Sequence, residues 1–151
     1  MAKQHPSGFE WSVLDNHKSK TCGTCIWSWN RGPGPKKLRC VGTGFTRVES
    51  GWPACEHWTS KDLDCLQCGA CCGRAFDVVE VSRQDPVRKN QPNWIDKRDG
   101  RYQMKRRSNN TCAALQGDRK CAIYADRPQC CREFVRGGVN CWFARRRVGL
   151  M

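Results

Sequence analysis

The chain has 151 residues, of which 13 are cysteine, and its formal net charge is +13. So high a cysteine density in a short chain is typical of either a disulfide framework or metal sites. The count is odd and residues 1–6 begin no apolar signal segment, so we expect metal thiolates in a cytoplasmic protein. No apolar run reaches the length of a membrane span.

Hydrophobic residues make up 38% of the chain, and the cysteines are counted among them. Few aliphatic side chains remain for a core, so metal–thiolate bonds would supply folding free energy, on the order of 10 kcal/mol per structural site. We expect a small α+β protein organised around metal, with two packed cysteine-rich modules, short strands, few helices and much irregular structure. The expected divisions are an N-terminal arm over residues 1–20, a four-cysteine module over 21–60 and a second module over 61–151.

The first four cysteines, Cys22, Cys25, Cys40 and Cys55, have a spacing that favours a cluster over a single zinc ion. Only the first pair forms a CxxC motif, and each of the other two follows a 14-residue loop. Zinc sites of this type usually take two such motifs, whereas the ligands of a cubane cluster bind irons at separate corners. The spacing therefore predicts one [4Fe-4S] cluster on these four thiolates.

Aromatic residues lie between these cysteines. We assign Trp27, Trp52 and Trp58 to the surroundings of the site, where they would exclude water and tune the metal. The same side chains could equally form the core of a small module, and both roles are compatible. His57 is a candidate donor to the site or an alternative ligand, although simple packing beside the site is the commoner arrangement for such a residue.

Residues 22–58 resemble the high-potential iron–sulfur protein family. The resemblance is carried by the sequence CGTC at 22–25, by the lone Cys40 and by the sequence GWPACEHW at 51–58. It implies one [4Fe-4S] cluster used in electron transfer, or a structural or regulatory module attached to a radical enzyme. The N-terminal part of that family's fold is not evident in the sequence.

The remaining cysteines fall between residues 65 and 141, and they begin with the dense run CLQCGACC at 65–72. This run and the later motifs closely resemble the YkgJ-type CxxCxxCC cysteine-cluster family over residues 65–147. That family is described as zinc- or iron-chelating, so the resemblance implies metal chelation and says little about activity.

Each cysteine of this region can be compared with the family pattern. The resemblance matches the opening motif to Cys65, Cys68, Cys71 and Cys72, the central cysteines to Cys112 and Cys121, the RPxxCRxF cysteine to Cys131, and a frequent later cysteine to Cys141. Cys130 occupies a variable position, so we interpret it as an extra thiol or an alternative ligand. The implied cofactors are one to three [4Fe-4S] clusters, with zinc as the alternative in the second module.

Two arginines, Arg127 and Arg132, flank Cys131 in the sequence. They would hold an anionic cluster electrostatically or bind the acidic group of a partner. An ordinary salt bridge is the commoner role for such residues.

Short secondary-structure elements are predicted between the cysteines of the second module. In chain order they are a strand over 75–82, a helix beginning at Ser82 with Pro86 in its first turn, hairpin strands over 94–97 and 101–107 joined at Asp99-Gly100, a strand over 120–124, and a helix from Asp126 to Val135 ended by Gly137-Gly138.

No recognised catalytic motif occurs in the chain, and Cys130 has no evident base partner, so we assign no catalytic residue and expect a protein that is not an enzyme. The leading hypothesis is an iron–sulfur protein that passes single electrons or serves a redox enzyme, with a protein partner. The alternative is a zinc-stabilised module that contacts nucleic acid or an acidic protein through the basic segments 83–107 and 145–147. Metal storage or delivery is a third hypothesis.

Overall fold

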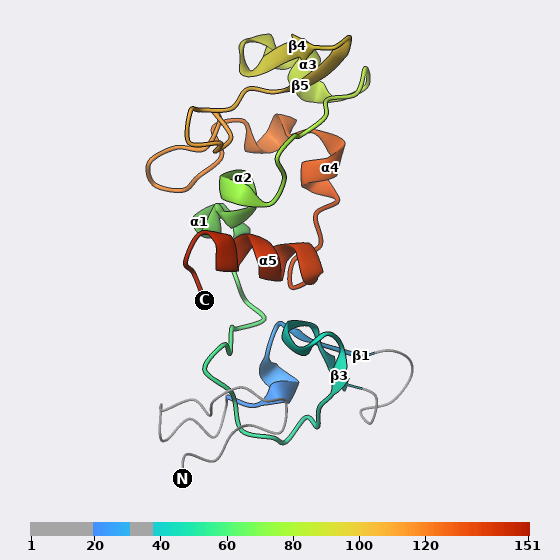
Figure 1. Ribbon diagram of the computed structural model, residues 1–151, viewed down its shortest axis with the longest axis vertical. Coiled ribbons are helices and arrows are strands. Elements are labelled where there is room, and N and C mark those ends of the chain that lie inside the picture. Colours follow the sequence, from blue (N-terminus) through green and yellow to red (C-terminus); the bar gives the residue numbers. More distant parts are fainter. Residues whose placement is uncertain (1–19, 31–37) are drawn as a thin grey trace. The chain divides into compact units, whose positions relative to one another are not determined.

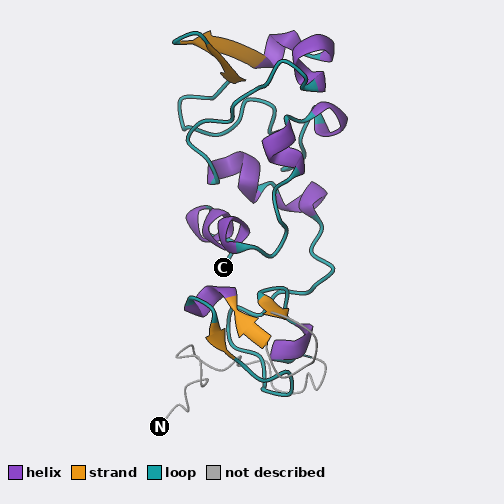
Figure 2. Ribbon diagram, turned by 90° about the vertical axis from the view of Figure 1, so that its right-hand side faces the viewer, coloured by secondary structure: helices purple, strands orange, loops and turns teal. Residues whose placement is uncertain are grey.

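The computed structural model describes residues 20–30 and 38–151, so the predicted N-terminal arm lies almost wholly outside the described residues. The chain divides into two compact units. The first runs to Leu63 and takes in Gly137–Trp142, and the second contains Asp64–Arg136 and Phe143–Met151. Both contain short helices, antiparallel strands and long loops, which confirms the predicted small α+β class (Figure 2). No helix in the described part of the chain is long and apolar enough to cross a membrane.

A three-stranded antiparallel sheet forms the centre of the first unit (Figure 1). Its strands are β1 (Ser28–Asn30), β2 (Leu38–Cys40) and β3 (Thr46–Arg47), in that order across the sheet. One short 3-10 turn, η1 (Cys22–Thr24), precedes the sheet, and another, η3 (Val41–Thr43), connects β2 to β3. Every one of these elements begins or ends beside a cysteine or a residue that packs on one.

A late segment of the chain completes the core of this unit. The Trp142 ring meets the buried Trp27 ring edge to face, with centroids 5.1 Å apart. A Cβ atom on Gly42 would lie 2.4 Å from a carbon of the Trp142 ring, so only glycine permits this approach. Trp142 belongs to α5 (Val139–Arg147), a helix that the sequence reasoning did not predict.

The second unit opens with two short helices that carry the dense cysteine run. These are α1 (Cys65–Cys68) and α2 (Ala70–Arg74), separated by Gly69 at φ +61°. The Asp64 carboxylate accepts a hydrogen bond from the Leu66 amide at 2.8 Å and so caps α1. Glycine is required between the helices because the left-handed backbone reverses the chain there.

The hairpin predicted around Asp99-Gly100 is confirmed. Strand β4 (Ile95–Arg98) pairs antiparallel with β5 (Arg101–Met104), and both turn residues have positive φ, as a tight two-residue hairpin turn requires. Helix α3 (Pro86–Asn90) and the 3-10 turn η4 (Pro92–Trp94) lead into β4. The predicted helix beginning near Ser82 therefore starts at Pro86, with Asp85 in the N-cap position.

Two strand predictions are wrong. In the segment 75–82 only Glu80 forms a bridge, to Gln103, because the backbone turns away at Ser82, whose amide donates to the Asp85 carboxylate at 2.7 Å. The segment 120–124 likewise contributes only a bridge between Cys121 and Leu115, since the chain turns after Cys121 and a 3-10 turn, η5 (Tyr124–Asp126), begins at the last residue of the segment.

The helix predicted from Asp126 to Val135 is much shorter than expected. Helix α4 spans Gln129–Arg132, and Pro128 rather than Asp126 occupies its N-cap position. Asp126 is engaged elsewhere, because its carboxylate accepts a hydrogen bond from the Asn90 side chain at 2.8 Å. A long-range contact therefore replaces the local cap that the sequence indicated.

Thiols are part of the hydrophobic core of the second unit. The buried members are Val79, Val81, Val87, Met104, Cys112, Ala114 and Ile123, and Cys72, Cys121 and Cys131 pack against them. The core and the cysteine group are therefore continuous, so the metal chemistry and the packing of this unit depend on the same residues.

Replacement of Gly69 by alanine is expected to destabilise the second unit. The residue has positive φ, and a Cβ there would lie 2.6 Å from the Arg119 carbonyl oxygen. Strain and clash together should lower the free energy of unfolding by roughly 2–4 kcal/mol. Gly117→Ala is the matched control, since its Cβ would meet no atom within 4 Å, and its effect should stay within about 0.5 kcal/mol. Equal effects in denaturant titrations of the two metal-loaded variants would contradict the prediction.

Candidate metal centres

Four cysteine side chains surround one small pocket in the first unit. The pocket is lined by Cys22, Cys25, Cys40 and Cys55, together with Trp27, Ser28, Ala54, His57, Trp58 and Trp142. The structure thus brings together the four cysteines that the spacing grouped.

Backbone hydrogen bonds bring these four cysteines together from distant parts of the chain. The Cys22 amide donates to the Trp52 carbonyl oxygen at 3.0 Å, and Cys25 forms a bridge with Ser60. These contacts tie η1 to the segment that contains Cys55. Cys40 reaches the same place through the sheet, because β2 pairs with β1 so that Cys40 lies opposite Ser28.

The surroundings of the pocket are aromatic and held in place by hydrogen bonds. The buried Trp27 indole N–H donates to the His57 carbonyl oxygen at 3.1 Å, and the Trp58 indole N–H donates to the Thr24 hydroxyl at 3.3 Å. The His57 ring lies 5.5 Å from the Trp142 ring, edge to face. Trp52, also assigned to these surroundings, packs instead against the core cluster that contains Cys22. Sequence spacing gave no signal for Trp142, which lies far along the chain.

In this pocket, burial and neighbouring thiols oppose the ionisation of Cys22 and Cys55. Burial and the neighbouring thiols of Cys55, Cys25 and Cys40 raise the pKa of Cys22 to about 12. Burial, with the nearby Cys25 and Cys40 thiols, raises the pKa of Cys55 to about 11. Metal ligation requires thiolates, so a cation among the four would remove the electrostatic cost that they impose on one another.

The four thiols line one pocket whose remaining walls are mostly aromatic. Over residues 20–30 and 38–151, no three His, Cys, Asp or Glu side chains converge closely enough to hold one metal ion. A four-iron cluster separates its ligands over the corners of a cube, whereas a tetrahedral zinc ion draws four sulfurs to about 2.3 Å from one centre. An all-thiol donor set fits a soft metal centre of either kind.

A second group of thiols forms a connected network in the other unit. The Cys72 thiol lies beside both Cys71 and Cys121, and interaction with it lowers the pKa of Cys71 to about 7 and that of Cys121 to about 6. The pKa of Cys72 is raised for the same reason. Cys131 lies near Cys71 and Cys112, and Cys112 lies near Cys121. The five thiols thus form a closed ring of neighbours.

Two further cysteines extend this ring at α1. Cys65 lies near both Cys68 and Cys71, and burial raises the pKa of its thiol. The Cys112 amide donates to the Cys72 carbonyl oxygen at 2.9 Å, so the loop that carries Cys112 is fixed to α2. Residues from four separate segments therefore meet around one group of sulfur atoms.

A family model for a CxxCxxCC domain, whose proposed role is chelation of zinc or iron, matches residues 64–145. This match covers more than half of the chain. The chain belongs to the CxxCxxCC family. No curated protein and no solved structure matched the chain. The predicted resemblance over 65–147 is confirmed, and membership of this family supports metal binding by the chain.

The family model does not extend to the first four cysteines. The resemblance of residues 22–58 to high-potential iron–sulfur proteins therefore stays a prediction. Its support in the structure is the grouping of the four thiols around one pocket.

Arginines surround the thiols of the CxxCxxCC domain. The Arg145 guanidinium donates from Nη1 to the Cys68 sulfur at 3.2 Å, and its buried Nε has no partner among the described residues. The pKa of the Cys121 thiol is lowered mainly by Cys72 and, to a smaller extent, by Arg127. The Arg127 guanidinium carbon lies 3.5 Å from the centre of the Tyr124 ring. These cations supply the positive charge that a group of metal thiolates needs.

Arg132 has a different role from Arg127. Its guanidinium lies 3.6 Å from the Asp85 carboxylate, which is buried and also accepts a hydrogen bond from the Gln129 amide at 2.8 Å. This ion pair anchors the start of α4, so Arg132 positions the segment that carries Cys131.

Two cysteines differ in placement from the others of the CxxCxxCC match. Cys141 is buried and lies in the segment that belongs to the first unit. Cys130 is exposed, and its thiol donates to the Glu80 carbonyl oxygen at 3.7 Å while also interacting with Cys131. The exposure of Cys130 agrees with its interpretation as an extra thiol, which remains a prediction.

Replacement of Arg145 by methionine is expected to weaken metal retention by the CxxCxxCC domain. The variant loses a charge-assisted hydrogen bond to the Cys68 sulfur, worth about 1.5–3 kcal/mol, so metal affinity should fall roughly 10- to 100-fold. Competition with a chelator measures the change. Arg146→Met, which removes an exposed charge from the same helix, is the matched control. If both variants lost metal at the same rate, the sulfur contact would have no role.

Proposed function

We propose that this protein binds a [4Fe-4S] cluster through Cys22, Cys25, Cys40 and Cys55 and serves in one-electron transfer, either alone or as an accessory subunit of a redox enzyme. The observation that carries the proposal is the arrangement of four thiols around one apolar pocket. The CxxCxxCC domain adds metal sites of its own, which hold iron–sulfur clusters or zinc.

The chemistry of the donor set supports iron–sulfur over a hard cation. All four candidate ligands are thiols, and the remaining lining is aromatic or small. Calcium and magnesium prefer oxygen ligands, whereas soft thiolates select zinc, copper(I) and iron–sulfur clusters. Among these the sequence spacing, with one CxxC pair and two single cysteines, favours the cluster.

The aromatic surroundings support a redox role. Trp27 is 1% exposed, and Trp142 is 3% exposed, so water is largely kept from that side of the pocket. The polarity and solvent access around a cluster set its reduction potential. When bound, the cluster would supply reversible one-electron chemistry, and the protein's part is to fix the thiolates and exclude water.

One side of this pocket remains close to solvent. Cys40 and Cys55 are only half-buried, whereas Cys22 and Cys25 are buried. A cluster held by these four residues would therefore have an edge near the protein surface, as a partner that exchanges electrons with it needs.

The cluster content of single-cysteine variants tests the assignment. Anaerobically purified protein should be brown and hold iron with acid-labile sulfide, and Cys40→Ser should lose about four irons and about four sulfides per chain. Cys130→Ser, an exposed thiol outside the proposed set, should retain both. Metal and sulfide analysis with electron paramagnetic resonance on one sample measures the outcome. Colourless wild-type protein holding only zinc would refute the proposal.

Removal of the metals is expected to abolish the cooperative unfolding of both units. Their cores are partly built from thiols, and the free energy of metal binding becomes folding free energy where the site does not exist in the unfolded chain. Calorimetry of the metal-free and metal-loaded protein at one pH measures this. A sharp thermal transition in the metal-free chain would show that the fold stands without its metals.

A further inference from the structure

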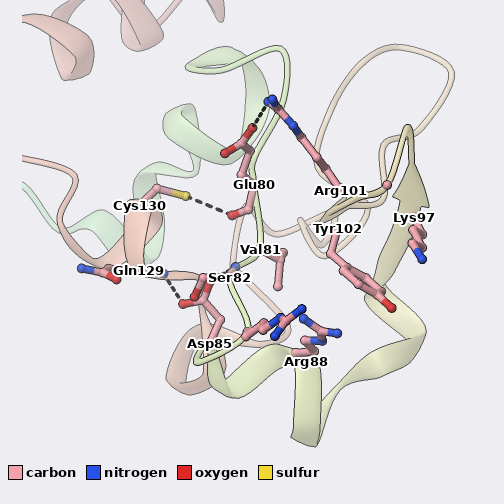
Figure 3. Close-up of a pocket in the computed structure, with 12 residues that line it drawn as sticks. Glu80, Val81, Ser82, Asp85, Arg88, Lys97, Arg101, Tyr102, Gln129 and Cys130 are labelled. Atoms are coloured by element: carbon pink, nitrogen blue, oxygen red, sulfur yellow. Dashed lines mark hydrogen bonds and ion pairs between the residues drawn. The ribbon is translucent and has the colours of Figure 1, made fainter.

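A second pocket in the CxxCxxCC domain lies beside α4 and is lined by one thiol, that of Cys130. It has a volume of about 640 Å³ and opens between the segment 80–85, α3, the β4–β5 hairpin and the start of α4 (Figure 3). Its volume falls within the range of about 300–1,000 Å³ that is usual for small-molecule sites. Its charged lining consists of Arg83, Arg88, Lys97, Arg101, Glu80 and Asp85.

The two carboxylates of this pocket are already neutralised. Glu80 accepts a hydrogen bond from the Arg101 guanidinium at 3.1 Å, and the two form an ion pair. The buried Asp85 carboxylate accepts hydrogen bonds from the Ser82 and Gln129 amides and lies 3.6 Å from the Arg132 guanidinium. Neither acid is available to balance the other cations of the lining.

Three cations of the pocket remain without an anionic partner. Within the described part of the chain, Arg83, Arg88 and Lys97 form no ion pair. Like charges brought together around one hollow repel one another, and no acid in the described part of the chain forms an ion pair with these three cations. An anion from outside would relieve this repulsion.

An aromatic ring fixes two of these cations. The Arg88 guanidinium carbon lies 4.0 Å from the centre of the Tyr102 ring, and the Lys97 ammonium nitrogen lies 5.7 Å from it. Lys97 faces Tyr102 directly across the hairpin, so strand pairing holds the two together (Figure 3). Cation–π contacts of this kind orient the charged groups before any ligand binds.

We propose that this pocket is a binding site for a small phosphate monoester. Three cations without an anionic partner carry more positive charge than the single carboxylate of a ligand would neutralise. A phosphate monoester carries about −1.5 to −2 charges at neutral pH and three acceptor oxygens, and arginine matches such oxygens with paired donors. The lining includes the Cys130 thiol and no other cysteine, so the proposal does not depend on which metal the remaining thiols hold.

Calorimetric titration of the metal-loaded full chain tests the site, with adenosine monophosphate, inorganic phosphate and adenosine as probes at about 0.15 M salt. Adenosine monophosphate and phosphate should bind, and adenosine should not. The ratio of the two phosphate affinities tells whether a free phosphate or an organic ester is the better ligand. Equal binding of adenosine and its monophosphate would overturn the proposal.

Charge-removing variants locate the binding. Arg83→Gln and Lys97→Gln each remove an exposed cation, so neither should disturb the fold, and each should weaken phosphate binding about tenfold. Lys89→Gln is the matched control, because Lys89 is an exposed neighbour of Arg88 on α3 that does not line the pocket. Its effect should stay below about twofold.

Two outcomes would assign the binding to another cause. If Lys89→Gln weakened binding as much as Lys97→Gln, the phosphate would be held by general surface charge. A single-stranded oligonucleotide without a terminal phosphate and a polyglutamate peptide test for a polyanion. If either bound more tightly than adenosine monophosphate, and the pocket variants weakened its binding equally, the surface would bind a polyanion instead. Either result would overturn the proposal for a small phosphate monoester.

Discussion

The crowding of thiols within and against the cores is the constraint on which both units depend. In the first unit the pKa values of Cys22 and Cys55 are raised by burial and by neighbouring thiols, so the sulfur atoms resist carrying charge together. In the second unit Cys72 interacts with both Cys71 and Cys121, whose pKa values are lowered to about 7 and about 6. Metal ligation requires thiolates, so a bound metal would relieve the electrostatic cost of bringing these sulfur atoms together. The same cysteines therefore contribute both to the packing of the cores and to the candidate metal sites.

Three arginines near the thiols make three different kinds of contact. Arg145 contacts a sulfur directly, Arg127 acts on the thiols from a stacked position, and Arg132 forms an ion pair that anchors a helix. The charges around Tyr102, by contrast, serve no thiol. The basic residues of the chain therefore lie in at least two different local settings, one beside the thiols and one around Tyr102.

Local signals in the sequence predicted local features well. The Asp99-Gly100 turn formed as expected because two adjacent residues that tolerate positive φ specify a tight hairpin almost alone. The grouping of the first four cysteines followed from spacing, and the CxxCxxCC motif identified the family. Where a distant residue competes with a local preference, the sequence misled: Asn90 engages Asp126 in place of a helix cap, and Asp85 turns the segment 75–82 out of a strand. Trp142 could not be assigned to the first pocket because only the folded chain brings α5 to it.

The return of Gly137–Trp142 to the first unit bears on how the chain is synthesised. The first four cysteines of that unit leave the ribosome early, but the Trp142 ring that closes one side of their pocket is synthesised much later. At about 5–20 residues per second, roughly 4 to 16 s separate the emergence of Leu63 from that of Trp142. During that interval the early thiols lack the Trp142 ring, so this side of their pocket can form only after Trp142 has been synthesised.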